Sequence, residues 1–172
     1  MQVHFNTSIM RLEETPLDVG YASQRVSLTN ESGQTCSIAG QKEHAQLILS
    51  TPFIDDALLH ELKEIVETNT KDNEYLSHVT LIVANETHTN PNIEGLDFLI
   101  DVSGEFGDWY GLRLVGQPLE GELTKALMLI SKDGAIFHDD YPQDLHQAFN
   151  HERLYRKMLA AHTCYTGKGC HE

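Results

Sequence analysis

The feature that most constrains the fold is a buried-strand pattern that leads directly into an amphipathic helix. Residues 45–49 (AQLIL) form a mostly apolar run, and Thr51-Pro52 ends it because proline cannot continue an interior ladder. Asp55 and Asp56 then supply a helix start, and apolar residues recur at helical spacing through 56–69. The apolar positions are Leu58, Leu59, Leu62, Ile65 and Val66. A strand followed by a helix at this spacing indicates an α/β fold.

The rest of the chain continues this alternation. We expect an N-terminal hairpin within 3–12, strands at 26–28, 79–84 and 96–102, a short helix at 105–110, a hairpin over 126–138 and a long helix at 143–162. The pattern predicts a thioredoxin-like α/β domain over 1–161, with a mixed central sheet flanked by helices. Residues 162–172 are expected to form a separate tail that contains cysteine and histidine.

Charge and hydropathy exclude several classes of partner. The 172 residues include 26 Asp plus Glu and 12 Lys plus Arg, so the formal net charge is −14. Such a chain repels phosphate backbones, and we expect no nucleic-acid partner. The apolar run at 127–130 is far shorter than the roughly 20 residues that a spanning helix needs, so we expect no membrane insertion. The first residues alternate like a strand rather than a leader peptide, which predicts a cytoplasmic protein.

Four stretches, in order, resemble a known family. They are Val3-His4-Phe5, Pro52-Phe53-Ile54-Asp55, Trp109-Tyr110-Gly111, and Pro118-Leu119-Glu120-Gly121 followed by Ala126 to Ser131. Together they resemble the thiol peroxidase branch of the peroxiredoxins, the atypical two-cysteine peroxiredoxin family. The resemblance implies a homodimer, a thioredoxin-like reductant and no cofactor.

The family's chemistry uses a cysteine in the first turn of a helix, where the helix dipole and a nearby arginine lower the pKa of the thiol. The resemblance places this sequence's Leu59 at the cysteine position and Asp56 at the position of a threonine that holds the peroxide. Lys125 stands at the arginine position, and Pro52 is retained. The family's second, resolving cysteine is expected within 85–96, which contains none.

These differences imply that the family's redox cycle is lost. Leucine has no nucleophile, and lysine lacks the planar fork with which arginine makes two parallel hydrogen bonds. An acid at position 56 and a base at position 125 lead us to a hypothesis: Asp56 and Lys125 form an ion pair across the old pocket. We also expect Leu59 to fill that pocket as an extension of the core.

The tail offers a second candidate site, with His162, Cys164, Cys170 and His171 close together in sequence. Cys164 and Cys170 could form a reversible disulfide, the four residues could bind zinc or copper, or the tail could be solvated and without a role. Cys36, on an expected strand, is interpreted as a small buried or half-buried hydrophobic residue.

Other polar clusters have structural interpretations. His138-Asp139-Asp140 could be a metal or acid–base cluster, but a polar turn between strand and helix explains it equally well. We expect His60 and Glu61 to lie on a solvated helix face, and His146 and His151 to point in different directions from one helix.

Three functions remain open at this stage. The first is a thiol-peroxidase-like protein that lacks the standard peroxidase reaction and is retained for binding or regulation. The second is a thiol–disulfide or peroxide-linked redox protein that uses Cys164 and Cys170. The third is metal binding through the tail.

Overall fold

The computed structural model describes residues 1–163, and a seven-stranded mixed sheet forms its centre. The sheet has the order β12-β11-β5-β8-β9-β3-β4. Its strands are β3 (Val26–Thr29), β4 (Thr35–Ile38), β5 (Gln46–Ser50), β8 (His78–Val83), β9 (Leu96–Ile100), β11 (Ala126–Ile130) and β12 (Ile136–Asp140). The smaller strands are β1 (Gln2–Phe5), β2 (Ser8–Leu12), β6 (Thr70–Lys71), β7 (Glu74–Tyr75) and β10 (Leu114–Val115). The helices are α1 (Asp56–Thr68), α2 (Glu105–Tyr110) and α3 (His151–Thr163).

The sheet is parallel in its centre and antiparallel toward both sides. β5, β8 and β9 run parallel, whereas β11 pairs antiparallel with β5, and β3 pairs antiparallel with β9. The predicted thioredoxin-like α/β architecture with a mixed central sheet is confirmed.

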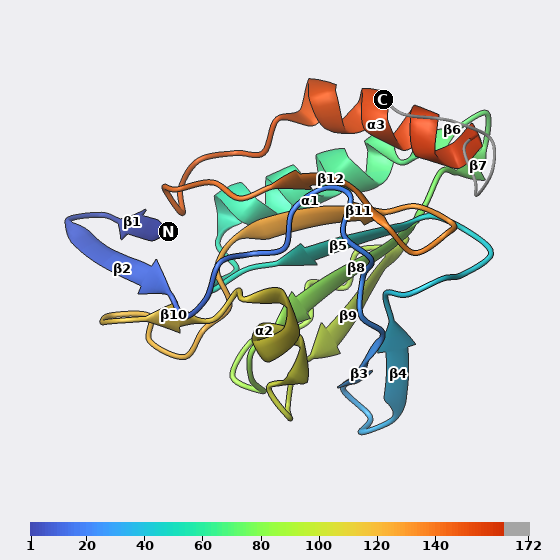
Figure 1. Cartoon of the computed structure of the whole chain (residues 1–172). Coiled ribbons are helices and arrows are strands. Elements are labelled where there is room, and N and C mark those ends of the chain that lie inside the picture. Colours follow the sequence, from blue (N-terminus) through green and yellow to red (C-terminus); the bar gives the residue numbers. More distant parts are fainter. Residues whose placement is uncertain (164–172) are drawn as a thin grey trace.

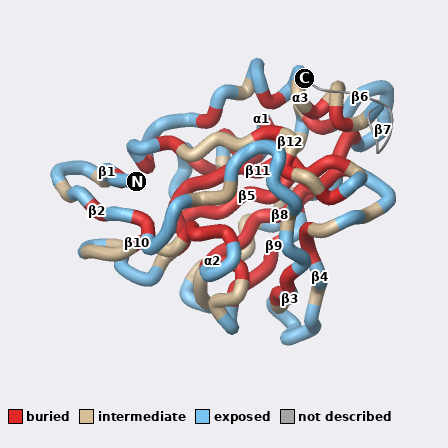
Figure 2. The backbone as a smooth tube through the Cα atoms, viewed as in Figure 1, coloured by how far each residue is buried: buried red, intermediate tan, exposed pale blue. Residues whose placement is uncertain are grey.

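Helices cover the two faces of this sheet unequally (Figure 1). α1 and α3 pack on one face, where Leu62, Ile65 and Leu154 belong to the larger apolar core. α2 packs on the other face, where Phe106 and Tyr110 join a second core. Figure 2 shows the central strands as the most continuously buried part of the molecule. Burial on both faces explains why these strands were recognisable as apolar runs.

The N-terminal hairpin lies beside the carboxyl end of β5 rather than in the central sheet. β1 pairs with β2, and β2 pairs with β10, to form a three-stranded sheet. The backbone N–H of His4 donates to Gln143 O (2.6 Å), and the N–H of Leu145 donates to His4 O (2.9 Å). The predicted hairpin is confirmed, and it fixes the segment that precedes α3.

The predicted hairpin over 126–138 is also correct. β11 and β12 are antiparallel neighbours joined through Asp133-Gly134. Gly134 has a φ of 88°, which favours glycine, and a Cβ there would lie 2.9 Å from the backbone nitrogen of Gln41. The turn therefore needs glycine for its conformation and for its close approach to the neighbouring loop.

One long element was predicted incorrectly. The sequence predicted a helix over 143–162, but α3 begins at His151. The reason is that the segment 143–145 makes strand-like hydrogen bonds with β1, as a parallel bridge between His4 and Asp144. Asn150 caps the actual start by accepting a hydrogen bond from the Arg153 N–H (3.0 Å). Among residues 1–163, the longest helices fall short of what a membrane span requires.

Candidate functional site

The candidate site lies where β5 ends and α1 begins. Pro52 is buried at the end of β5, and the Asp55 side chain caps α1 by accepting a hydrogen bond from the Leu58 N–H (2.8 Å). Ala126 pairs with Ser50, so Lys125 enters the site one residue before β11 begins. The remaining wall comes from the irregular segment 141–150, which β1 holds in place.

A buried carboxylate, Glu61, is the centre of this site. It lies on the inward stripe of α1 with Leu58, Leu62 and Ile65, and its side chain is only 8% exposed. One oxygen accepts from Lys125 Nζ (2.7 Å). The other accepts from the Phe149 N–H (2.6 Å) and contacts His151 Nε2 (3.1 Å). The expectation that Glu61 is solvated is therefore wrong.

The ammonium group of Lys125 is buried and makes three contacts within the protein. Its side chain is 5% exposed, and Nζ donates to Glu61 and to the carbonyl oxygen of Gln147 (2.6 Å). Nζ also lies 4.8 Å from the centre of the Phe149 ring, which is a cation–π distance. Of the three N–H donors of lysine, two are used by Glu61 and the Gln147 carbonyl oxygen, and the Phe149 ring lies close to the same group.

The ionisation of Glu61 follows from these contacts. Burial raises the pKa of Glu61, because it disfavours the charged form. Hydrogen bonds from His151 and Lys125 oppose this effect, and the Phe149 amide adds to them. The net result is a pKa below the ordinary value of 4.5, so Glu61 is ionised at neutral pH.

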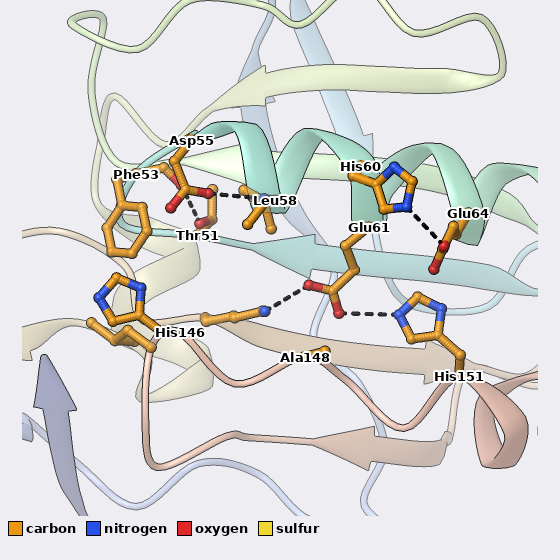
Figure 3. A pocket seen from close by; sticks show the side chains of 13 residues that line it. Thr51, Phe53, Asp55, Leu58, His60, Glu61, Glu64, His146, Ala148 and His151 are labelled. Atoms are coloured by element: carbon orange, nitrogen blue, oxygen red, sulfur yellow. Dashed lines mark hydrogen bonds and ion pairs between the residues drawn. The ribbon is translucent and has the colours of Figure 1, made fainter.

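A half-enclosed cavity of about 210 Å³ lies between α1 and the segment before α3. Figure 3 shows Phe53 and His146 at one end, and Glu61 and His151 pointing toward one another at the other. Leu58 lines it from α1, and His60 lies at its edge in an exposed pair with Glu64 (3.1 Å). The cavity combines apolar walls with imidazoles and carboxylates, a lining suited to holding a small polar molecule.

An aromatic cluster closes the cavity toward the N-terminal hairpin. The rings of Phe5 and Phe53 lie 5.3 Å apart, and the His146 ring lies 5.3 Å from Phe5. His146 Nε2 also contacts Asn6 Oδ1 at 2.9 Å. The hairpin therefore supports one wall of the site, a contact that the sequence did not reveal.

Comparison with known proteins agrees with this architecture. The chain is 25% identical to a thiol peroxidase of Campylobacter jejuni, over 98% of both chains. Its structure is similar to that of a peroxiredoxin-like protein from Aquifex aeolicus, with a TM-score of 0.79, 19% identity, and coverage of 92% of this chain and 95% of the other. A thiol peroxidase from Chromobacterium violaceum has a TM-score of 0.75 at 12% identity, with the same coverages. No protein-family model matches the sequence.

The near full-length similarity to a thiol peroxidase and the peroxiredoxin-like fold support an assignment to the thiol peroxidase and peroxiredoxin family.

The contacts of the positions that the family resemblance indicates differ from our hypothesis. Lys125 pairs with Glu61 and not with Asp56, which is exposed at the start of α1. The proposed ion pair between Asp56 and Lys125 is therefore wrong. Glu61 lies further along α1 on the buried stripe, and this position brings its carboxylate to the ammonium group.

Leu59, at the family's cysteine position, is half-buried in the first turns of α1. Among the described residues, Leu58 rather than Leu59 lines the cavity, and Leu58 is the one that belongs to the large core. The expectation that Leu59 fills the pocket is therefore wrong, because Leu58 packs inward instead.

The histidines were also misplaced by sequence reasoning. His146 and His151 both line the cavity, because residue 146 lies outside α3 and the five-residue helical spacing does not apply. The signal that could have identified Glu61 was its spacing, since position 61 falls between Leu58 and Leu62 on the same helical face.

The His138-Asp139-Asp140 cluster is divided in the structure. His138 is buried, and burial lowers its pKa to about 4, with the nearby charges of Arg153 and Lys157 adding to the effect. Asp140 accepts a hydrogen bond from the Asn150 N–H (2.9 Å). Asp139 faces a different segment, described below. Within residues 1–163, no group of three or more metal-ligating side chains is assembled.

The tail site falls almost entirely outside the described residues. Cys164, Cys170 and His171 are beyond residue 163, whereas His162 Nε2 lies 3.7 Å from Glu74 Oε1. The redox and metal hypotheses for the tail stay predictions. Cys36 is half-buried on β4, as its structural interpretation predicts.

Proposed function

We propose that this protein is a peroxiredoxin-family member that does not reduce peroxide at the family's active site, and that it acts in binding or regulation. The observation that carries the proposal is that the Lys125 ammonium group is buried and already bonded within the protein. In the family resemblance this position supplies the cation that holds the peroxide, and here its ammonium group is committed to Glu61, the Gln147 carbonyl and the Phe149 ring.

The residue at the nucleophile position supports the same proposal. Leu59 has no group that attacks a peroxide oxygen, and the neighbouring Asp56 carries a negative charge where the family keeps a hydroxyl. A carboxylate at that position would raise the pKa of a nearby thiol and oppose thiolate formation. Three positions thus each oppose the family's reaction for a different chemical reason.

The cavity beside α1 supports a binding role. It retains about 210 Å³ of space, with the Phe53 ring and the Leu58 side chain as apolar walls and His151 as a polar group. Glu61 holds the wall of the cavity through its hydrogen bonds with Phe149, just before α3, and with His151, the first residue of α3. A site with its reactive groups removed and its shape maintained is consistent with a retained binding or regulatory function.

The test is a peroxide-reduction assay coupled to a thioredoxin-like reductant. The full-length protein is compared with a Cys164→Ser, Cys170→Ser variant. We expect turnover at or near the uncatalysed rate in both proteins. Saturable turnover that persists in the double variant would overturn the proposal. Turnover that is lost in the double variant would assign the activity to the tail pair and favour the alternative redox function.

The assembly state remains part of the proposal. The family resemblance predicts a homodimer, and light scattering of the full-length protein measures its mass directly. A monomer at micromolar concentration would contradict this expectation without affecting the proposal on peroxide reduction.

A further inference from the structure

Residues 17–23 form a strap that crosses from β2 to the outer edge of the central sheet. The Gly20 N–H donates to Ile136 O (2.9 Å), and the Ile136 N–H donates to Tyr21 O (2.9 Å). The Ser23 N–H donates to Gly134 O (2.8 Å). In Figure 1 the strap is the blue trace that passes beside β12 before descending to β3. It covers the edge of β12 as an extra strand would.

Side chains fasten the strap to the core at both ends. The Tyr141 hydroxyl donates to Leu17 O (2.6 Å), and the Ser23 hydroxyl donates to Gly134 O (2.6 Å). Leu17 also packs, partly buried, against the core on the α2 face of the sheet. Just after the strap, the Tyr110 hydroxyl donates to Gln24 O (2.5 Å). The strap is therefore part of the folded domain rather than a loose connection.

One polar atom under the strap has no partner in the described structure. Asp139 Oδ2 is buried without a hydrogen bond. The antiparallel bridge between Ala22 and Ala135, continued along the strap, brings Asp18 opposite Asp139, and the two carboxyl groups interact. Two carboxylates are both acceptors, so they bond only when one carries a proton. Without that proton they repel each other.

We propose that Asp18 and Asp139 share one proton and that this proton holds the strap on β12. The charged groups that act on Asp139 favour its protonation. Asp18 faces it from the strap, and Asp140 follows on the same strand; both are negative. The Val19 N–H, which donates to Asp18 Oδ1 (2.7 Å), opposes them, while the Tyr141 hydroxyl is committed to Leu17.

The pKa of Asp139 is raised toward neutral pH. Burial, then the hydrogen bond and charge of Asp18, raise the pKa of Asp139 from 3.8 to about 6. In a released strap the carboxyl would return toward its ordinary value. Release therefore becomes more favourable as the pH rises from 3.8 to about 6 and changes little above that. The strap is a pH-sensitive element in which Leu17 separates from the core as the shared proton is lost.

Amide hydrogen exchange on the full-length protein tests the proposal. After correction for intrinsic exchange rates, the protection factors of the Gly20 and Ser23 amides are compared between pH 5 and pH 7.5. The two pKa values of 3.8 and about 6 give an expected loss of protection of about tenfold over this interval. Amides in β8 serve as an internal reference.

Two variants make the result decisive. Asp18→Asn supplies an amide donor to Asp139 at every pH, so we expect the pH dependence of strap protection to disappear. Glu14→Gln removes one nearby exposed charge outside the pair and should leave the dependence intact. Asp18 is exposed, so its substitution tests the idea without changing the buried core. Constant strap protection in the wild-type protein, or an unchanged dependence in Asp18→Asn, would overturn the proposal.

Discussion

Glu61 and Asp139 are carboxylic acids whose partners differ in sign. Glu61 lies among an ammonium group, an imidazole and a backbone amide, and its pKa is lowered. Asp139 lies beside two further carboxyl groups and has a buried oxygen without a hydrogen bond, and its pKa is raised to about 6. Burial raises the pKa in both cases. The comparison shows that the supply of donors, rather than depth, decides whether a carboxyl group in this fold is a fixed anion or a titrating one.

The largest expected effect comes from removing the cation beside Glu61. Lys125→Met leaves a buried carboxylate without its ion-pair partner, and we expect the free energy of unfolding to fall by about 3–5 kcal/mol. Urea denaturation at pH 7 measures this. Lys63→Met, on the exposed side of α1, is the matched control and should change stability by less than about 0.5 kcal/mol.

A companion variant tests the electrostatic reason for that loss. Glu61→Leu combined with Lys125→Met removes both charges and should recover part of the stability lost in Lys125→Met. If Lys125→Met alone costs less than about 1 kcal/mol, the pair is not the centre of the site and the comparison with Asp139 fails.

A smaller effect is expected when one of the other donors to Glu61 is removed. His151→Phe keeps a ring of similar size but loses the hydrogen bond at 3.1 Å, and we expect a loss of about 1–2 kcal/mol in the same assay. The control is His60→Phe, because the pair between His60 and Glu64 is exposed and worth at most about 0.5 kcal/mol. Equal losses in the two variants would show that burial adds nothing to the hydrogen bond.

The smallest effect has the opposite sign. Asp139→Asn removes a group whose folded-state pKa is raised, so its cost is absent below pH 3.8 and fully present above about pH 6. We expect the variant to be more stable than the wild type at pH 7.5 by about 1 kcal/mol, after allowance for solvent screening. The stability difference between the two proteins should vanish below pH 4, as measured by denaturation across pH. A stability loss at pH 7.5 would contradict this reading.

The pH profile of the Glu61 site should run the other way. Because the folded-state pKa of Glu61 is lowered, its stabilising contribution is present above pH 4.5 and is lost as the pH falls through the folded value. The wild-type protein is therefore expected to lose stability below pH 4.5. A Glu61→Gln variant should show a shallower loss over that range.

Much of the fold was predictable because its local signals agree with its tertiary contacts. The apolar run of β5, the capping Asp55 and the stripe from Leu58 to Ile65 all indicate the same strand and helix. The segment 143–150 is different. Leu145 and Phe149 have helical spacing, but hydrogen bonds to β1 hold the backbone at Leu145 in another conformation. A tertiary partner outweighed a local pattern there.

The candidate site was less predictable because the charge of Glu61 was given more weight than its position on the apolar face of α1. The family resemblance led to positions 56, 59 and 125, but the partner of Lys125 is Glu61, which was assigned to solvent because it is charged. Its helical spacing places it with Leu58 and Leu62. The Asp18–Asp139 contact depends on a strap that crosses to the far edge of the sheet, and no local sequence signal specifies such a crossing.

The central claim is that this family site no longer reduces peroxide. The most direct measurement is the rate of hydrogen peroxide consumption by the wild-type protein with excess reductant, beside a Cys36→Ser, Cys164→Ser, Cys170→Ser variant without thiols. We predict that both match the protein-free rate within error over many equivalents of peroxide. Rapid, saturable consumption by the wild-type chain would contradict the account.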